Sequence, residues 1–232
     1  ENFLRALDGA LRDRGVVSER EFAERRTQIS QRTAELRVQP LAPPADAGIT
    51  YGYASQCIDE IRTPLTTIFN EIGVQRQYMS FSAPHDFFGS CMAGGLGWAL
   101  PAALGAQLAA PERQVIVALG DGSYIFANPL ACHQFAAAQG LPLLTIIFNN
   151  SGWDSVRRAA RLMYPQGKAA ASEWPLLSAV TPSPDYKQVI SACGGYGERV
   201  AQCGELPEAL QRCLRVVTEE RRQALLELVI AD

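Results

Sequence analysis

Apolar and polar positions along the chain follow two different periods, which predicts strands that alternate with helices. Runs of mostly apolar residues, typical of buried strands, occupy residues 115–119, 143–148 and 224–230, the last two interrupted by Thr145 and Glu227, with shorter strand patterns at 66–69 and 198–202. Helical patterns fit the segments between them, at residues 53–62, 97–109, 186–193 and 207–222. We therefore predict an α/β fold, a three-layer α/β/α sandwich around a mainly parallel sheet.

The first part of the chain carries many charges and few apolar residues, and its pattern predicts two helices. Ser18 and Glu21 have the spacing of a capping box at the start of the second helix. Prolines between residues 40 and 44 then stop helical structure. We expect an N-terminal helical arm and linker at 1–50 and one α/β domain at 51–232.

Residues 153–184 are rich in proline, glycine and alanine and lack a sustained period, so we predict irregular structure there. An irregular stretch of this length is usually functional or mobile. It contains Arg157, Arg158 and Arg161. We expect these arginines to lie on a solvated face, with contact to an anionic substrate as the alternative.

Composition limits the classes of function. The chain has 232 residues, of which 47% are hydrophobic, enough for one substantial core. A net charge of −3 gives no electrostatic reason to expect nucleic acid or an anionic membrane as partner. No apolar run is long enough to span a bilayer, and the charged start is not a signal peptide, so we expect a cytoplasmic protein. The start without methionine indicates a fragment.

Cysteine and histidine show no pattern typical of a metal or disulfide site. The six cysteines are scattered without a Cys-x-x-Cys motif, so we expect reduced thiols. His85 falls on a predicted loop, where it could reach a substrate or be merely solvated. His133 falls within a predicted helix, where burial against the sheet is expected.

Two polar motifs follow two of the predicted buried strands. Gly120-Asp121-Gly122-Ser123 comes directly after the run at 115–119, and Asn149-Asn150 follows the run at 143–148. A helix-sized segment separates the motifs, so both emerge at the carboxyl edge of one parallel sheet, where open α/β sheets bind ligands. A carboxylate, an amide oxygen and backbone freed by glycine suit a divalent cation that holds a phosphate.

The two motifs resemble the GDG and NN signature of thiamine-diphosphate-dependent enzymes. The stretch from Ala93 to Gly105, continued at 111–116, is similar to benzoylformate decarboxylases and acetolactate synthases. The resemblance extends from about Tyr51 to the end. It covers the C-terminal diphosphate-binding domain of enzymes that normally carry three domains, and implies the thiamine-diphosphate-binding fold. The residues before Tyr51 resemble the helical tail of the middle domain.

The resemblance implies a magnesium site. Its ligands would be the Asp121 carboxylate, the Asn150 side-chain oxygen and the backbone carbonyl of Gly152, completed by diphosphate oxygens and a water. Ser123 would contact a phosphate oxygen. The motif spacer is two residues longer than in those relatives, which predicts a longer connection at 124–129.

The resemblance also implies where thiamine diphosphate lies. Leu96 matches the bulky apolar residue beneath the bent cofactor, and Gly94 matches the residue whose carbonyl accepts a hydrogen bond from the aminopyrimidine. Trp153 either lines the substrate pocket or packs in the core, and we favour the pocket. The expected cofactor-binding residues are Ile72, Gly73, Gly94, Gly95, Leu96, Gly120, Asp121, Gly122, Ser123, Asn150, Gly152 and Trp153.

The function implied by the resemblance is that of a lyase or transferase acting on a small 2-oxo acid, as a decarboxylase or an acetolactate-synthase-like carboligase. The enzyme would be a homodimer or homotetramer with pyrimidine-binding and middle domains absent from this sequence. The activating glutamate would lie on the pyrimidine-binding domain, so no catalytic residue is assigned and the fragment alone should be inactive. The alternatives are a C–C hydrolase, an acyltransferase, or a non-catalytic diphosphate- and magnesium-binding module.

Overall fold

The structure, a computed structural model, describes residues 2–15, 18–36, 38, 41, 43–81, 83–90, 94–172 and 178–231. It divides into two compact units, residues 1–39 and 40–232. The first unit holds the two predicted helices, α1 (Asn2–Asp13) and α2 (Glu19–Glu35). Ser18 and Glu21 form the predicted capping box, in which each side chain accepts a hydrogen bond from the other residue's backbone N–H.

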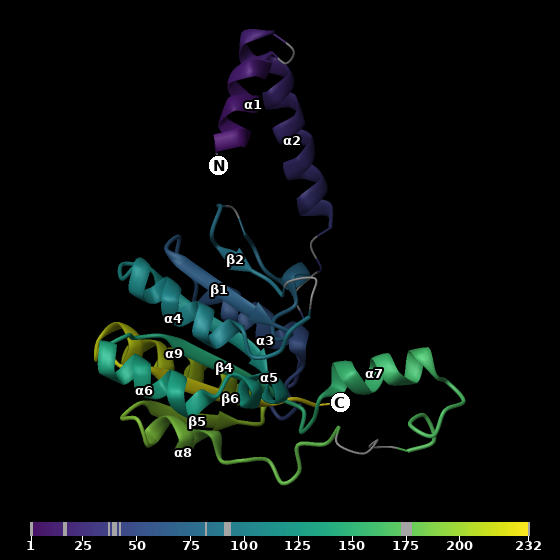
Figure 1. The fold of residues 1–232 in the computed structure, drawn as a ribbon, viewed down its shortest axis with the longest axis vertical. Coiled ribbons are helices and arrows are strands. Elements are labelled where there is room, and N and C mark those ends of the chain that lie inside the picture. Colours follow the sequence, from purple (N-terminus) through teal and green to yellow (C-terminus); the bar gives the residue numbers. More distant parts are fainter. Residues whose placement is uncertain are drawn as a thin grey trace. The chain divides into compact units, whose positions relative to one another are not determined.

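The second unit contains one six-stranded sheet in which every strand pair is parallel (Figure 1). The strand order is β2-β1-β3-β4-β6-β5. The predicted parallel α/β fold is therefore confirmed. The strands are β1 (Thr66–Glu71), β2 (Phe87–Phe88), β3 (Gln114–Gly120), β4 (Leu144–Asn149), β5 (Tyr196–Val200) and β6 (Ala224–Val229).

Helices cover both faces of the sheet, as a parallel sheet requires. α3 (Tyr51–Glu60) and α9 (Leu206–Thr218) pack with one apolar cluster, which includes Ile116 and Leu226. α4 (Ala99–Ala109), α6 (Pro129–Gln139) and α8 (Tyr186–Ser191) pack with the other, which includes Val117 and Leu225. Alternate residues of one strand thus enter opposite clusters. The remaining elements are α5 (Asp121–Phe126), α7 (Asp154–Met163), η1 (Arg76–Tyr78) and η2 (Cys203–Glu205).

The structure corrects the prediction of irregular structure after Trp153, because α7 occupies residues 154–163. No residue of α7 is buried, although Val156, Ala159, Ala160 and Met163 have helical spacing. This period covers only ten residues of a stretch rich in proline, glycine and alanine, and the prediction missed it. The first turn of α7 is stabilised locally, since Asp154 forms ion pairs with Arg157 and Arg158 at spacings of three and four residues. Strand β5 begins two residues earlier than predicted, and the two-residue strand β2 was not predicted.

Gly48 and Ile49, just before α3, belong to the second unit and pack within it. Ile49 is fully buried, and bridges join Gly48 to Gln202 and Ile49 to Ile230. Five of the cysteines are free, and Cys91 lies outside the described residues. Within the described part of the chain, no helix has the length and apolar character needed to cross a membrane.

Candidate cofactor and metal site

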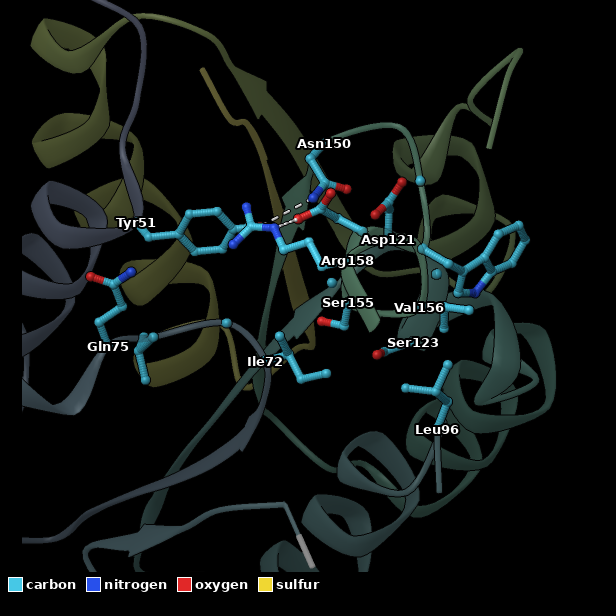
Figure 2. Close-up of a pocket in the computed structure, with 17 residues that line it drawn as sticks. Tyr51, Ile72, Gln75, Leu96, Asp121, Ser123, Asn150, Ser155, Val156 and Arg158 are labelled. Atoms are coloured by element: carbon cyan, nitrogen blue, oxygen red, sulfur yellow. Dashed lines mark hydrogen bonds and ion pairs between the residues drawn. The ribbon is translucent and has the colours of Figure 1, made fainter. Parts of the chain in front are cut away.

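A cavity of about 310 Å³ opens at the carboxyl edge of the sheet, where β1, β3 and β4 end (Figure 2). It is lined by the GDGS motif, by the turn after β1, and by the segment that runs from Asn150 into α7. Gly120 pairs with Phe148 in the register of β3 and β4, so the two predicted motifs end side by side. The expectation that Asp121 and Asn150 come together is met.

Asp121 is the buried acid of this cavity. Its side chain is 1% exposed, and neither carboxylate oxygen accepts a hydrogen bond of normal geometry from the described residues. Burial raises the pKa of Asp121 to about 6, against the opposing effect of backbone N–H groups at residues 122, 121, 152 and 150. A buried carboxylate without partners is costly, and a cation would remove that cost.

Asn150 presents its amide oxygen to the same space. Its Nδ2 donates a hydrogen bond to the Tyr51 hydroxyl at 3.4 Å, while its buried Oδ1 has no partner among the described residues. Desolvation, followed by the charges of Asp121 and Asp154, raises the pKa of Tyr51 to about 12. The phenol therefore stays neutral and holds the amide with its oxygen free to act as a ligand.

The turn after β4 orients the backbone of Gly152. Trp153 N–H donates to the Ser178 carbonyl at 2.9 Å, and Val180 N–H donates to the Ser151 carbonyl at 2.8 Å. These bonds flank an antiparallel bridge between Gly152 and Ala179. Because the neighbours make the bridge bonds, the N–H and C=O of Gly152 itself point away from Ala179, and its N–H faces the Asp121 carboxylate. This orientation agrees with a backbone ligand at Gly152.

Ile72 enters the cavity from the end of β1 in a left-handed conformation, with φ of 61°. This conformation is unusual for a β-branched residue. The Asn70 side chain maintains it by accepting hydrogen bonds from Gly73 N–H at 3.0 Å and Val74 N–H at 2.8 Å. A Cβ at Gly73 would lie 2.7 Å from the Ala118 carbonyl carbon. The turn therefore requires glycine there and directs Ile72 to the ligand space.

Glu71 positions the glycine-rich turn before α4, and sequence reasoning missed it. This buried carboxylate accepts hydrogen bonds from Gly97 N–H at 2.6 Å and Ala99 N–H at 2.8 Å. Leu96, immediately before these donors, lines the cavity. An acidic residue at the end of a predicted strand was the available signal, but its partners lie 26 and 28 residues away.

The structure brings most of the predicted site residues into this cavity. Gly94 and Gly95 are described but do not line it, and Ala93 lies outside the described residues. Trp153 lines the cavity, and its indole N–H has no partner among the described residues. Its contact with a substrate stays a prediction. The remaining predicted residues that line the cavity are Ile72, Gly73, Leu96, Gly120, Asp121, Gly122, Ser123, Asn150 and Gly152.

The cavity also contains residues that were not predicted. Arg158 lines it beside Tyr51 while remaining on an exposed helix face, so the expected solvated position and the alternative contact with an anionic substrate both stay open for this residue (Figure 2). Its side chain is 75% exposed and forms an ion pair with Asp154 at 2.5 Å. The irregular pattern assigned to this region gave no basis for placing α7 at the cavity. The other additions are Tyr51, Val74, Gln75, Asp154, Ser155 and Val156.

The two histidines take no part in the cavity. His85 is exposed on its loop. His133 is buried, as expected, and forms hydrogen bonds with Tyr124 and Gln223. In the described residues no group of three or more His, Cys, Asp or Glu side chains could hold a metal ion.

A metal that suits this site must therefore accept few protein side chains. Magnesium does so, since it is usually held by one or two protein ligands together with phosphates and water. The unpartnered oxygens of Asp121 and Asn150 are hard oxygen donors of the kind it prefers. The residues present fit a magnesium ion with a diphosphate.

The fold and site define a ligand-binding α/β domain with an acidic, oxygen-rich cavity at the carboxyl edge of a parallel sheet. Residues 72–228 match the family model "Thiamine pyrophosphate enzyme, C-terminal TPP binding domain". The match covers more than half of the chain, so the chain belongs to this family. The resemblance inferred from the GDG and NN motifs is confirmed.

Curated relatives and a solved structure agree with this assignment. The chain is 25% identical over 164 residues to sulfoacetaldehyde acetyltransferase of Alcaligenes xylosoxydans, covering 71% of this chain and 26% of that protein. It is 29% identical over 143 residues to the putative acetolactate synthase large subunit IlvX of Mycobacterium tuberculosis, covering 61% and 27%. With acetolactate synthase 3, chloroplastic, of Brassica napus, it shares 26% identity over 217 residues, covering 91% and 32%.

The solved structure is the thiamine diphosphate-dependent 4-hydroxybenzoylformate decarboxylase of Rhodococcus jostii RHA1. It has a TM-score of 0.68 and 24% identity, and the match covers 84% of this chain and 34% of that one. This likeness supports the fold. The chain spans about a quarter to a third of the length of the relatives it matches.

Proposed function

We propose that this chain is the diphosphate- and magnesium-binding part of a thiamine-diphosphate enzyme that acts on 2-oxo acids, by decarboxylation or carboligation. The observation that carries the proposal is the group of unpartnered oxygens on Asp121 and Asn150 in one cavity. Membership of the thiamine pyrophosphate enzyme family supports the cofactor. The names of the acetolactate synthase and decarboxylase relatives support the substrate class.

In this proposal the Asp121 carboxylate, the Asn150 Oδ1 and the Gly152 carbonyl hold the magnesium ion, and Ser123 contacts a phosphate oxygen. Leu96 and Ile72 provide apolar surface for the organic part of the cofactor. Bound thiamine diphosphate supplies the electron sink for breaking or forming a bond next to a carbonyl group. This chain's residues contribute binding, orientation and an environment shielded from water.

The relatives' greater length supports further parts of the proposal. The residue that activates the cofactor would lie on a pyrimidine-binding domain outside this sequence. The arm before residue 51 would be the tail of a middle domain. The proposed enzyme would assemble as a homodimer or homotetramer. It would be located in the cytoplasm.

The test is Asp121→Ala in the natural full-length protein. Thiamine diphosphate binding is measured by calorimetry while magnesium is varied. We expect the magnesium-dependent binding to disappear, because removing the charged ligand removes the main attraction for the cation. Unchanged affinity at limiting magnesium would reject the metal assignment. Intact near-ultraviolet circular dichroism would show that the core is retained.

Acyl transfer with the same cofactor is the second candidate, supported by the name of the sulfoacetaldehyde acetyltransferase relative. The two candidates differ in products. Carbon dioxide released from pyruvate indicates action on a 2-oxo acid, whereas acetyl phosphate formed from sulfoacetaldehyde and inorganic phosphate, with release of sulfite, indicates acyl transfer. The Asp121→Ala variant serves as the blank in both assays.

A further inference from the structure

Glu227 is a buried carboxylate that the proposed metal and cofactor contacts do not use. It lies on β6, is 2% exposed, and its Oε1 accepts a hydrogen bond from Asn149 Nδ2 at 2.8 Å. The same oxygen is 3.1 Å from Nε of Arg199 on β5. A buried carboxylate is tolerated where such partners compensate its loss of water. Glu227 on β6 therefore links β5, through Arg199, to the end of β4, through Asn149.

The sheet register brings these groups together. Glu227 pairs with Arg199 on one side and with Ile147 on the other, and Asn149 lies two residues beyond Ile147. Residues two apart on a strand face the same side of the sheet. The side chains of Glu227 and Asn149 thus lie on the same face of the sheet. The side chains of Leu226 and Leu228 lie on the opposite face.

Asn149 carries this link into the turn that holds the proposed ligands. Because its Nδ2 donates to Glu227, its Oδ1 faces the other way and accepts a hydrogen bond from Ser151 N–H at 2.8 Å. Ser151 has a left-handed backbone with φ of 60°. Ser151 lies between Asn150 and Gly152 in the chain. Its backbone conformation therefore sets the directions of the Asn150 Oδ1 and of the Gly152 carbonyl oxygen.

We propose that Glu227 is a positioning residue for the metal site: through Asn149 it holds Ser151, and with it the Asn150–Gly152 turn, in the ligand-presenting conformation. The inference rests on the proposed function. Without the acceptor on Glu227, the Asn149 amide has no fixed partner at Nδ2 and the hydrogen bond to Ser151 loses its orientation. Groups that orient metal ligands typically change metal affinity about 10–100-fold when they are removed.

The experiment compares variants in the natural full-length protein by the magnesium concentration that half-saturates thiamine diphosphate binding, measured by calorimetry. Glu227→Leu removes the acceptor at similar volume, and we expect the half-saturating concentration to rise about 10–100-fold. Glu227→Gln keeps an acceptor oxygen, and we expect recovery to within about threefold of wild type. Asn149→Ala leaves Glu227 paired with Arg199 and should reproduce the loss, which guards against misfolding of Glu227→Leu.

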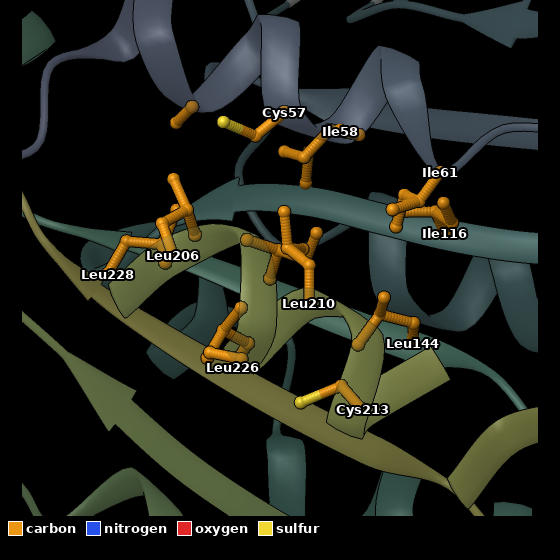
Figure 3. Packing of buried hydrophobic residues seen from close by; sticks show 14 of the residues in the cluster. Cys57, Ile58, Ile61, Ile116, Leu144, Leu206, Leu210, Cys213, Leu226 and Leu228 are labelled. Atoms are coloured by element: carbon orange, nitrogen blue, oxygen red, sulfur yellow. The ribbon is translucent and has the colours of Figure 1, made fainter. Parts of the chain in front are cut away.

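Leu226→Ala is the matched control for stability. Leu226 adjoins Glu227 on β6 but enters the cluster that packs with α3 and α9 (Figure 3). This variant should lower the melting temperature while its half-saturating magnesium stays within about threefold of wild type. Wild-type magnesium dependence in a folded Glu227→Leu or Asn149→Ala protein would overturn the inference. So would equal losses in the Gln and Leu variants.

Asp121→Ala separates this inference from the proposed function. If Asp121→Ala abolishes magnesium-dependent binding and the Glu227 and Asn149 variants do not weaken it, only the positioning role fails. If Asp121→Ala binds as wild type does, the metal site itself is wrong and the positioning role falls with it.

Discussion

Gly122 lies against the indole ring of Trp153, and a Cβ atom at residue 122 would be 2.4 Å from both Cδ1 and Nε1 of that ring. Trp153 also meets Phe126 edge-to-face, with ring centroids 6.1 Å apart. The second glycine of the GDG motif is thus required by packing within the chain. At Gly120, by contrast, an added Cβ meets no atom within 4 Å, so only a bound ligand could require glycine there.

This contrast predicts opposite effects of two alanine substitutions on the unfolding free energy. Gly122→Ala should destabilise the ligand-free protein by about 1–3 kcal/mol, because the methyl group must displace the indole. Gly120→Ala should stabilise it by about 0.4–1 kcal/mol, because its backbone, with φ of −72° and ψ of 160°, is open to alanine. Urea unfolding in EDTA measures both.

Both substitutions should still weaken thiamine diphosphate binding. Gly120→Ala adds a methyl group beside the cavity, and Gly122→Ala moves the Trp153 wall. We expect each variant to lose about tenfold in thiamine diphosphate affinity, which corresponds to about 1.4 kcal/mol of binding free energy. A Gly120→Ala protein that binds the cofactor with wild-type affinity would show that the ligand does not approach residue 120.

The sequence predicted that Asp121 and Asn150 would come together because each motif directly follows a strand. A parallel register necessarily places the end of β3 beside the end of β4, so Asp121 and Asn150 could be brought together from two apolar runs alone. The capping box of Ser18 and Glu21 is equally local. The capping box depends on residues three apart, and the meeting of Asp121 with Asn150 depends on two strand patterns and the parallel register that relates them.

The parts that were missed depend on distant residues or on exposed structure. Glu71 acts on a turn 26 residues away, and Glu227 contacts an asparagine 78 residues away. Each acid stands out locally, Glu71 at the end of a strand and Glu227 within an apolar run, but no local pattern identifies the partner that it contacts. α7 begins with ion pairs of Asp154 and buries no residue. Its apolar residues have helical spacing, but only over ten residues within a stretch rich in proline, glycine and alanine, so the prediction overlooked them.

Asp121 should limit the stability of the metal-free protein. The pKa of this carboxyl is raised from 3.8 to about 6 by burial, so ionisation costs the folded state on the order of 3 kcal/mol at neutral pH. Because the folded pKa is the higher one, stability is lost as pH rises from about 4 through about 6. We expect Asp121→Asn to remove most of that loss, so EDTA-treated wild type and variant should converge near pH 4.

Excess magnesium with thiamine diphosphate should reverse this order. Ligand binding stabilises wild type in proportion to the logarithm of ligand concentration, whereas the variant should gain little. Thermal melting with and without both ligands measures the change. A variant that is less stable than wild type in EDTA at pH 8 would contradict the cost assigned to the buried carboxylate.

Glu71 should support both stability and the position of Leu96. Glu71→Leu leaves the N–H groups of Gly97 and Ala99 without acceptors, which should cost about 2–4 kcal/mol of unfolding free energy. Glu208→Leu is the control for loss of an acid, because that side chain is 85% exposed, and should change stability by about 0.5 kcal/mol or less. Guanidinium unfolding followed by circular dichroism compares them, and equal effects would refute the role of Glu71.

His133 should make the fold sensitive to acid. Gln223 Nε2 donates to the His133 carbonyl at 2.9 Å, so Gln223 Oε1 is the atom facing His133 Nδ1 at 2.7 Å and must accept its proton. His133 Nε2 is then free of hydrogen and accepts from the Tyr124 hydroxyl at 2.8 Å. The neutral ring satisfies both contacts, whereas a protonated ring would have no acceptor for the second proton unless the tyrosine hydroxyl turned.

Burial lowers the pKa of His133 from its ordinary 6.5, with the Gln223 hydrogen bond opposing the shift. Above pH 6.5 both folded and unfolded states are neutral at this residue. As pH falls below 6.5, the unfolded state binds a proton that the folded state does not, so stability falls by up to about 1.4 kcal/mol per pH unit. His133→Gln retains a donor and an acceptor but does not titrate, and His85→Gln removes the exposed histidine as a control. Urea unfolding between pH 7.5 and 5 should therefore give a shallower loss for His133→Gln than for wild type or His85→Gln, and parallel curves for all three would show that His133 takes up its proton equally in both states.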